Sequence, residues 1–275
     1  MSRQSARLVS AVIIGLFAVA TAAYADSSRQ LTIGVFGGAS LSTIRGDDLS
    51  GSLSSINLGP LDDSDEFDIF DPTITDPLGT VVINDVTLDP VKSRTGFTLG
   101  AFLNVPISEV FSIQPEMHYV ARGAKQDLEF DATVDPGGLD IPLAVPGGLE
   151  WQFNYIEIPV LAKITMPVQG SISPSFIAGP ALALRTSSKV EAEALGVSES
   201  ADIKDIIKST DVGLVFGGCL DVRMSPTTVL NFDARYNLGM SDLLDVPPIL
   251  SLFTPSMKNG GFGFRVAIGY RLGRN

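Results

Sequence analysis

The sequence is poor in several residues on which secreted proteins and enzymes commonly rely. It has one cysteine, Cys219, and one histidine, His118, in 275 residues. A single cysteine cannot form an intramolecular disulfide, which stabilises many small secreted domains. Basic residues are also few, because 19 Lys and Arg against 31 Asp and Glu give a net charge of −12. Nucleic acids bind basic surfaces, so no nucleic-acid partner is expected.

Long apolar runs are missing as well. After residue 25 no run approaches the roughly 18 apolar residues that a transmembrane helix requires. The apolar stretch Leu8–Ala20 is short, follows the basic residues Arg3 and Arg7, and precedes a small-x-small site at Ala23-Tyr24-Ala25. These three parts predict a secretory signal peptide. An uncleaved anchor helix is the alternative.

Cleavage after Ala25 divides the chain into a signal peptide at 1–25 and one domain at 26–275. This domain must fold without disulfides, yet 45% of all residues are hydrophobic and the mean hydropathy is +0.28. A soluble secreted domain can have this composition, but a β-barrel with an apolar exterior, stabilised by closure of its sheet, has it more often. The expected location is therefore the outer membrane of a Gram-negative cell.

Eight segments alternate apolar and polar residues with the period of two that marks a strand with two different faces. They are Gln30–Ser42, Ser93–Asn104, Val110–Gln126, Trp151–Thr165, Ile172–Thr186, Asp211–Met224, Thr228–Met240 and Gly260–Leu272. Each is long enough for a tilted strand to cross a bilayer. The fold class predicted is all-β: a closed antiparallel transmembrane β-barrel of eight strands.

The alternation alone does not say which face is inside. In Thr228–Met240, for example, Leu230 and Phe232 share one face while Asn231 and Asp233 share the other. A soluble ligand-binding barrel would place the apolar face inside, and a membrane barrel would place it outside. Both alternatives remain open on periodicity.

The connections favour the membrane barrel. Short turns at 105–109, 166–171 and 225–226 alternate with long connections at 43–92, 127–150, 187–210 and 241–259. Outer-membrane barrels have short periplasmic turns and long extracellular loops. The four long connections also hold 24 of the 31 acidic residues. The segment Asp62–Asp68 is dense in carboxylates but lacks the order of a calcium-binding loop, so weak divalent-cation binding, bridging to lipopolysaccharide, is only a hypothesis.

One motif carries a family resemblance. The residues from Asn154 to Lys163, Asn-Tyr-Ile-Glu-Ile-Pro-Val-Leu-Ala-Lys, resemble the signature strand of the PorT-like outer-membrane β-barrel family, and Phe111–Glu116 and Ala178–Leu182 support the likeness. The resemblance implies an eight-stranded barrel of the OmpA and OmpX type, with membrane lipid, lipopolysaccharide and the barrel-assembly machinery as partners. It transfers no catalytic residue. The long first connection and the terminal Gly273-Arg274-Asn275 depart from the pattern.

The remaining charge falls on the inner faces of the strands. The predicted lumen residues are Glu116, Arg122, Glu157, Lys163, Asp221, Arg223, Asp233, Arg235, Arg265 and Arg271. Eight strands leave an interior that side chains fill, and a buried charge needs a partner. We interpret the set as a structural plug of ion pairs, in which Glu157 pairs with Arg122 or another inward arginine and Lys163 with a carboxylate near the periplasmic turns. An ion-conducting lumen is the alternative.

The single histidine and the single cysteine do not indicate a catalytic site. His118 falls near mid-barrel beside Glu116, where pairing with a carboxylate is structural rather than catalytic, and Cys219 reads as a small buried thiol. No enzymatic function, cofactor or metal site is therefore predicted. The tyrosines and tryptophan of the strands are candidates for an interfacial aromatic girdle; they are Tyr119, Trp151, Tyr155 and Tyr236.

Four prolines interrupt the predicted strands, and each removes one ladder hydrogen bond. They are Pro115, Pro159, Pro174 and Pro180, and bulges or strand ends are expected there. The function expected overall is a structural or surface-interaction role in the outer membrane. A narrow passive pore and, after it, a soluble ligand-binding barrel are the alternatives.

Overall fold

The computed structural model describes residues 30–46, 51–52, 73–76, 79–135, 141–194, 197–204, 206–244 and 256–272. The predicted signal peptide and its cleavage site, the acidic segment Asp62–Asp68 and the last three residues lie outside these ranges. Within the described ranges, no helix has the length and apolar character needed to cross a membrane.

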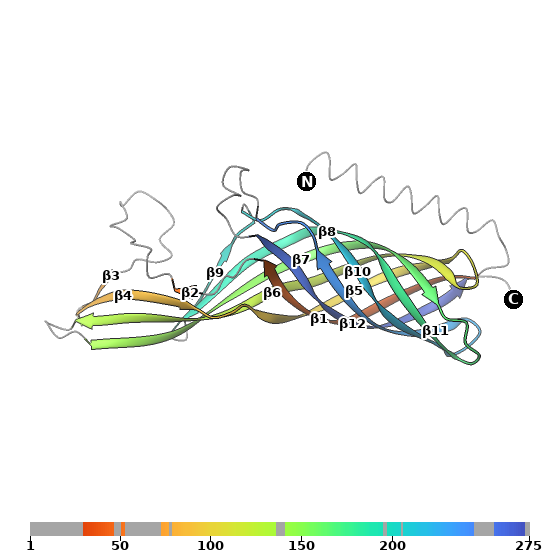
Figure 1. Cartoon of the computed structure of the whole chain (residues 1–275), viewed down its shortest axis with the longest axis horizontal. Helices are drawn as coiled ribbons and strands as arrows, with labels where there is room; N and C mark the ends of the chain where they lie inside the picture. Colours follow the sequence, from red (N-terminus) through yellow and green to blue (C-terminus); the bar gives the residue numbers. More distant parts are fainter. Residues whose placement is uncertain are drawn as a thin grey trace.

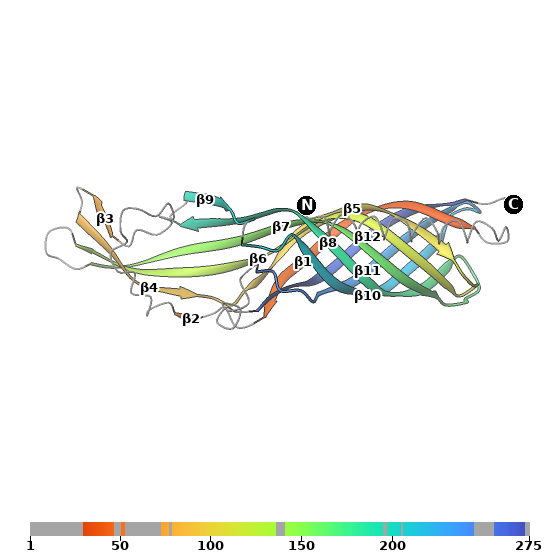
Figure 2. The ribbon, with the colours of Figure 1, turned by 90° about the horizontal axis from the view of Figure 1, so that it is seen from above.

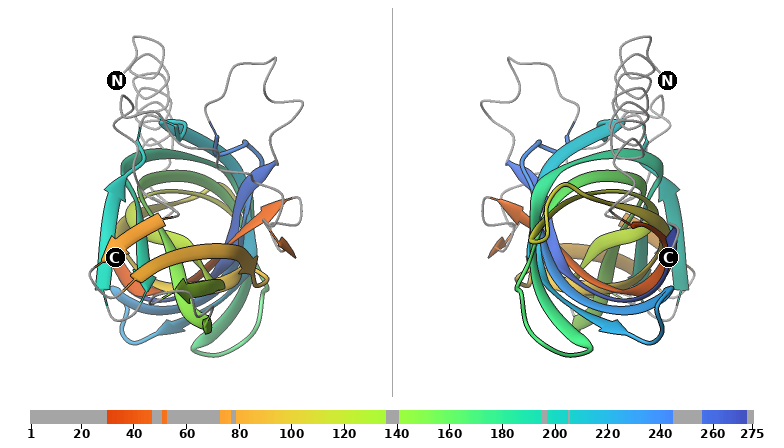
Figure 3. Two further views of the ribbon diagram at one scale, coloured as in Figure 1. Left: turned by 90° about the vertical axis from the view of Figure 1, so that its left-hand side faces the viewer. Right: turned by 90° about the vertical axis from the view of Figure 1, so that its right-hand side faces the viewer.

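Eight long strands form one closed antiparallel ring. They are β1 (Leu31–Gly46), β5 (Lys92–Pro106), β6 (Phe111–Asp135), β7 (Ile141–Thr165), β8 (Ile172–Ala194), β10 (Thr210–Arg223), β11 (Thr228–Gly239) and β12 (Met257–Leu272). Each pairs with the next, and β1 pairs with both β5 and β12, which closes the ring. Figure 3 shows the ring along its axis. The predicted eight-stranded barrel is confirmed.

The apolar face of the barrel is its outside. On β12, Phe264, Val266 and Ile268 are about half exposed, whereas Arg265 and Ala267 between them are buried. Large exposed apolar side chains continue around the ring: Ile33, Val35, Phe97, Leu99, Met117, Ile164, Phe176, Leu214, Phe216, Leu220, Phe232 and Phe262. Lipid is the natural solvent for such a surface. The alternative of a soluble barrel with an apolar interior is therefore wrong.

The predicted short turns all lie at one end of the barrel. They connect β5 to β6, β7 to β8 and β10 to β11, and backbone hydrogen bonds close them, such as Ile107 N to Phe111 O at 2.9 Å and Met224 N to Thr228 O at 3.0 Å. Strand β1 begins and strand β12 ends at this end as well. Because short turns of outer-membrane barrels face the periplasm, we call it the periplasmic end.

At the opposite end, the sheet continues beyond the barrel (Figures 1 and 2). The connections expected as loops at 127–150 and 187–210 are largely strand, because β6 and β7 each have 25 residues and β8 has 23. Four further strands are β2 (Gly51–Ser52), β3 (Thr73–Asp76), β4 (Gly79–Leu88) and β9 (Val197–Asp202). We call β4, β9 and residues 125–135, 141–150 and 189–194 the extension.

The extension forms because the alternation of β6 does not stop at the barrel rim. Lys125, Asp127 and Glu129 are exposed on one face, while Gln126 and Leu128 are buried on the other. Strand β4 pairs with this part of β6, and β9 pairs with the matching part of β8. A two-stranded hairpin alone is marginally stable, but several strands sharing an apolar face are stable.

The rim between barrel and extension is marked by irregular backbone. Gly123 has a φ of +152°, and a Cβ there would lie 1.8 Å from the Trp151 carbonyl oxygen. Next to it, the β7–β8 register shifts between Asn154 and Tyr155. Such irregularities bend a strand and increase its twist. The curved ring therefore opens into a sheet at this level.

The bulges expected at the strand prolines are not found. The β6–β7 register is unchanged across Pro115, and β8 pairs with β10 through Pro180 and Pro174 without a shift. The β7–β8 register also continues past Pro159. A proline removes one N–H from the ladder, and the neighbouring hydrogen bonds hold the register.

The predicted aromatic girdle is half wrong. Trp151 and Tyr155 share the inner face of β7 with Glu157, and Tyr155 is completely buried. Tyr119 and Tyr236 do lie on the outer face, each beside a phenylalanine of a neighbouring strand at ring-centroid distances of 5.4 and 4.9 Å. Tyr119 and Tyr236 therefore stay predicted members of the girdle.

Candidate functional site in the barrel lumen

Four charged side chains fill the middle of the lumen, and we call them the quartet: Glu116, Asp233, Arg235 and Arg265. The Nη1 atoms of Arg235 and Arg265 each donate to Glu116 Oε2 at 2.9 Å. Arg265 Nη2 donates to Asp233 Oδ2 at 2.7 Å, and Arg235 Nε donates to Asp233 Oδ1 at 2.9 Å. None is more than 6% exposed. Two positive and two negative charges make the cluster neutral.

The quartet joins opposite walls of the barrel. Asp233 and Arg235 share the inner face of β11, and Arg265 is the direct β12 partner of Asp233. Glu116 comes from β6, which is separated from β12 by β1 and β5. Arg265 also stacks over Phe36 of β1, with its guanidinium carbon 3.8 Å from the ring centroid. These side chains therefore cross the lumen rather than line it.

A second charged group lies above the quartet, toward the extracellular end. Arg122 Nη2 donates to Glu157 Oε2 at 2.5 Å, which is the contact expected from the sequence. His118 Nε2 lies 3.2 Å from the same oxygen. His118 is the direct strand partner of Glu157, so it lies against Glu157 and not against Glu116 as its place along β6 had indicated.

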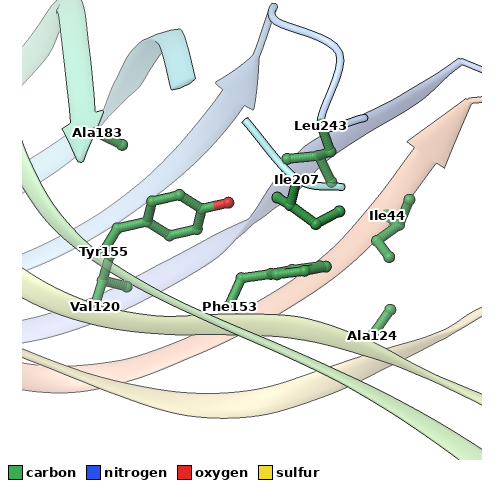
Figure 4. Close-up of a cluster of buried hydrophobic side chains, with 8 residues drawn as sticks. All are labelled: Ile44, Val120, Ala124, Phe153, Tyr155, Ala183, Ile207 and Leu243. Carbon is green, nitrogen blue, oxygen red and sulfur yellow. The ribbon is translucent and has the colours of Figure 1, made fainter. Parts of the chain in front are cut away.

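An apolar layer closes the lumen above this group (Figure 4). Its members are buried side chains from four strands and two extracellular connections: Ile44, Val120, Ala124, Phe153, Tyr155, Ala183, Ile207 and Leu243. Phe153 and Tyr155 are fully buried. The Tyr155 hydroxyl accepts a hydrogen bond from Asn259 Nδ2 at 3.1 Å, and the same amide nitrogen donates to Asp211 at 2.9 Å. The single polar group of the layer is thus satisfied.

A third charged group lies toward the periplasmic end. Lys163 Nζ is 2.6 Å from Asp221 Oδ2, so Lys163 does meet a carboxylate near the turns. Asn231 Nδ2 donates to Asp221 Oδ1 at 2.7 Å, and Ser175 Oγ donates to Oδ2 at 3.2 Å. Arg223 and Arg271, also assigned to the lumen, lie nearby but form no ion pair with any residue that the structure describes.

The lumen offers little for catalysis. His118 is 7% exposed and its Nε2 is engaged with Glu157. Cys219 is buried in a small apolar cluster with Leu161 and Val215, as the sequence indicated. Among the described residues, no three His, Cys, Asp or Glu side chains are grouped to hold a metal ion. The arrangement can pair charges and exclude solvent.

Sequence reasoning missed the apolar layer. Phe153 could have been found, because it has the same alternation as Glu157 and must point inward with it. Ile207 and Leu243 could not, because they belong to connections whose path depends on the finished barrel. The bridge between Ile207 and Leu244 brings these two connections together over the lumen.

An apolar exterior, a closed ring of eight strands and a charged, packed interior together define a small β-barrel of the outer-membrane type. The model of the outer membrane protein beta-barrel domain matches residues 21–245, which is most of the chain. The chain belongs to this family, and its location is the outer membrane. A search of curated proteins finds no match to it.

Several solved structures resemble the chain distantly. The attachment invasion locus protein of Yersinia pestis is 14% identical, with 89% of this chain and 100% of that one covered and a TM-score of 0.35. Neisserial surface protein A is 12% identical, with 87% and 97% covered and a TM-score of 0.37. OprG from Pseudomonas aeruginosa is 12% identical, with 88% and 96% covered and a TM-score of 0.35. These values are too low to support an inference about this chain.

Proposed function

We propose that this protein is a non-conducting outer-membrane barrel that holds an ordered sheet in the extracellular space, with a structural or surface-interaction role. The observation that carries the proposal is the length of β6 and β7, whose 25 residues continue from the barrel wall into the extension without leaving the β-ladder. Loops that serve only to connect strands have no need of such order.

The lumen supports a closed barrel. The apolar layer, the Glu157 group and the quartet succeed one another along the axis, and each consists of buried side chains in mutual contact. Ion passage would require moving the bidentate contacts between arginine and Glu116, which are strong in a low-dielectric interior. The passive pore is the competing function.

The extension supports a role in contact with other molecules. Its outward face carries Asp127, Glu129, Glu191 and Glu193, with Lys125 and Lys189 as the balancing bases. An acidic surface of this kind favours cationic partners and repels anionic ones. At the edges of the extension, β9 has only six residues, and β4 is partly covered by the short strands β2 and β3, which limits uncontrolled strand addition.

Surface labelling tests which end of the barrel faces the outside of the cell. In a Cys219→Ala background, Glu129→Cys in the extension and Glu109→Cys in the β5–β6 turn both place a thiol at an exposed position. A membrane-impermeant maleimide added to intact cells is expected to label the first and spare the second. Labelling of the turn variant alone would reverse the orientation and remove the proposed role.

Conductance tests the closed lumen. The full mature chain, reconstituted in a planar bilayer, is expected to produce no steady single-channel current. Steady current through the wild type, altered in selectivity by Glu157→Gln, would make the passive pore the function instead. Insertion is verified in the same preparation by the mobility difference between boiled and unboiled samples.

Finer features of the proposal rest on the sequence. They are the PorT-like subgroup, export by a signal peptide cut after Ala25, a non-catalytic role, insertion by the barrel-assembly machinery, and weak divalent-cation bridging from Asp62–Asp68 to lipopolysaccharide. Mass spectrometry of the membrane form tests the cleavage. Calorimetric titration with calcium tests the bridging, and the absence of heat would remove it.

A further inference from the structure

A cavity of about 510 Å³ occupies the periplasmic part of the lumen, and we call it the vestibule. Its mouth is bordered by the β5–β6 and β7–β8 turns, and its inner end reaches Gln114 and the quartet residue Arg265. The quartet closes its inner end, so the vestibule is reached from the periplasmic side. Volumes of this size are typical of sites that bind small molecules.

The vestibule has more positive than negative side chains in its lining, which contains Glu109, Lys163, Asp221, Arg223, Arg265 and Arg271. Arg223 and Arg271 line it, and neither forms an ion pair with a described residue. Arg271 lies close enough to both groups to be repelled by the charge of Arg223 and attracted by that of Asp221. Both come from strand ends, Arg223 at the end of β10 and Arg271 beside the end of β12, with β11 between them.

Neither of the lining carboxylates, Glu109 and Asp221, forms an ion pair with these two arginines. Asp221 already accepts hydrogen bonds on Oδ1 from Asn231 and on Oδ2 from Lys163 and Ser175. The other lining arginine, Arg265, is neutralised within the quartet. Two guanidinium groups thus face a polar pocket with their donors unused by protein carboxylates.

We propose that the vestibule binds a small solute bearing a phosphate group from the periplasmic side. A phosphate monoester carries close to two negative charges at neutral pH, which matches the two arginines that have no ion-pair partner. The planar guanidinium offers paired N–H donors that suit phosphate oxygens. The rest of the pocket is larger than a phosphate and is lined in part by Asn104 and Asn231. Their side-chain amide nitrogens donate to neighbouring residues, and their amide oxygens suit the hydroxyl groups of a ligand as acceptors.

Calorimetric titration of the full mature chain in a non-ionic detergent at fixed ionic strength tests the site. The probes are glucose 6-phosphate, inorganic phosphate and glucose. Glucose 6-phosphate is expected to bind and glucose is not. Binding of glucose 6-phosphate at least tenfold tighter than inorganic phosphate identifies a phosphorylated organic solute, whereas equal binding identifies free phosphate as the natural occupant. If neither phosphate probe binds, the proposal is wrong.

Variants that remove positive charges show whether binding depends on Arg223 and Arg271. Arg223→Gln with Arg271→Gln is expected to weaken binding of glucose 6-phosphate at least tenfold. The control Arg185→Gln removes an arginine of β8 that pairs with Tyr155 at the level of the apolar layer, and it should leave binding unchanged. The shift between boiled and unboiled samples confirms that each variant is folded. Equal weakening by Arg185→Gln, or unchanged binding by the double variant, would show non-specific attraction and overturn the site. Neither result affects the closed lumen or the extension.

Discussion

Arg122 Nη2 and Glu157 Oε2 lie 2.5 Å apart inside the barrel, on neighbouring strands β6 and β7. Both side chains are almost fully buried, and His118 touches the same carboxylate. Two charges taken out of water in this way depend on each other, because either one alone would remain buried without compensation. The pair therefore makes a sharp test of whether the lumen is dry and packed or wet and open.

Glu157→Gln is expected to destabilise the folded barrel by about 3–5 kcal/mol, because it leaves the buried Arg122 without its counter-ion. Urea unfolding in micelles measures the change. Glu129→Gln in the exposed face of the extension is the matched control, and its effect should stay within about 0.5 kcal/mol. A stable Glu157→Gln protein would indicate that water screens the lumen.

Phe153→Ala is expected to cost about 3–5 kcal/mol, because it empties a fully buried site in the apolar layer. The quartet still blocks the lumen below, so the variant should not conduct. Phe97→Ala, which removes the same group from the exposed outer face, is the control and should unfold at nearly the wild-type urea concentration. Steady current through Phe153→Ala would show that the apolar layer alone closes the barrel.

Ile158→Arg is expected to impair assembly. Ile158 points outward between the buried residues Glu157 and Pro159, so its side chain meets lipid. A basic residue at the bilayer midplane costs a membrane barrel about 2–4 kcal/mol. The yield of heat-modifiable protein in the outer membrane measures the effect, with Ile158→Ala as the control. Equal yields of the two variants would contradict the assignment of faces.

The extension should loosen in acid through Glu150. Partial burial acts to raise the pKa of Glu150, but the hydrogen bonds and charges of Arg94 and Lys125 outweigh it and hold the pKa below its usual value. A depressed carboxyl pKa contributes stability above the unfolded pKa, and this contribution is lost as the pH falls through the folded pKa. Because Glu150 is only partly buried, solvent screens its ion pairs, and the loss of stability in acid should be small.

The fluorescence of Trp151, the only tryptophan and the neighbour of Glu150, reports this acid transition. In the wild type it should change as the pH falls from about 5 toward 3, since the ordinary pKa of Glu is near 4.3. In Glu150→Gln the change over this range should be much smaller. Asp202→Asn, which removes an exposed acid of β9, is the control, and an identical loss in that variant would exclude Glu150 as the cause.

The barrel could be predicted because its signals are local. Each strand alternates along its own sequence, as Leu230 to Asn237 illustrate, and the face of every residue then follows from its parity. The same rule correctly placed the side chains of Glu157 and Lys163 in the lumen. It would also have placed Tyr155 correctly, since Tyr155 is two residues from Glu157 and must share its inner face. Tyr155 was instead assigned to the outer girdle because it is aromatic.

Partners across the lumen could not be predicted in the same way. Glu116 reaches Arg235 and Arg265, which lie 119 and 149 residues away along the chain. Strand order fixes the neighbours of each strand but not which inward side chains are long enough to meet over the axis. The stagger of the strands around the ring decides that, and stagger is a property of the closed barrel.

The extension escaped prediction for a different reason. Acidic residues such as Asp127, Glu129 and Asp131 resemble a solvated loop when only composition is considered. Their alternation with Gln126, Leu128 and Phe130 indicates a strand, but a strand outside a membrane needs neighbours to be stable. The strands that complete the sheet are β4, which pairs with β6, and the end of β8, which pairs with β7, and both come from other connections of the barrel.

The continuity of β6 and β7 from wall to extension dictates an order of events during insertion. The acidic hairpin end that bears Asp127, Glu129 and Asp131 reaches its final side only by crossing the membrane. Moving carboxylates through the hydrocarbon core of the membrane costs much free energy. The finished lumen offers no other path, because it is packed with side chains. The hairpin tip must therefore be translocated while the ring is still open, before β1 and β12 come together as its seam.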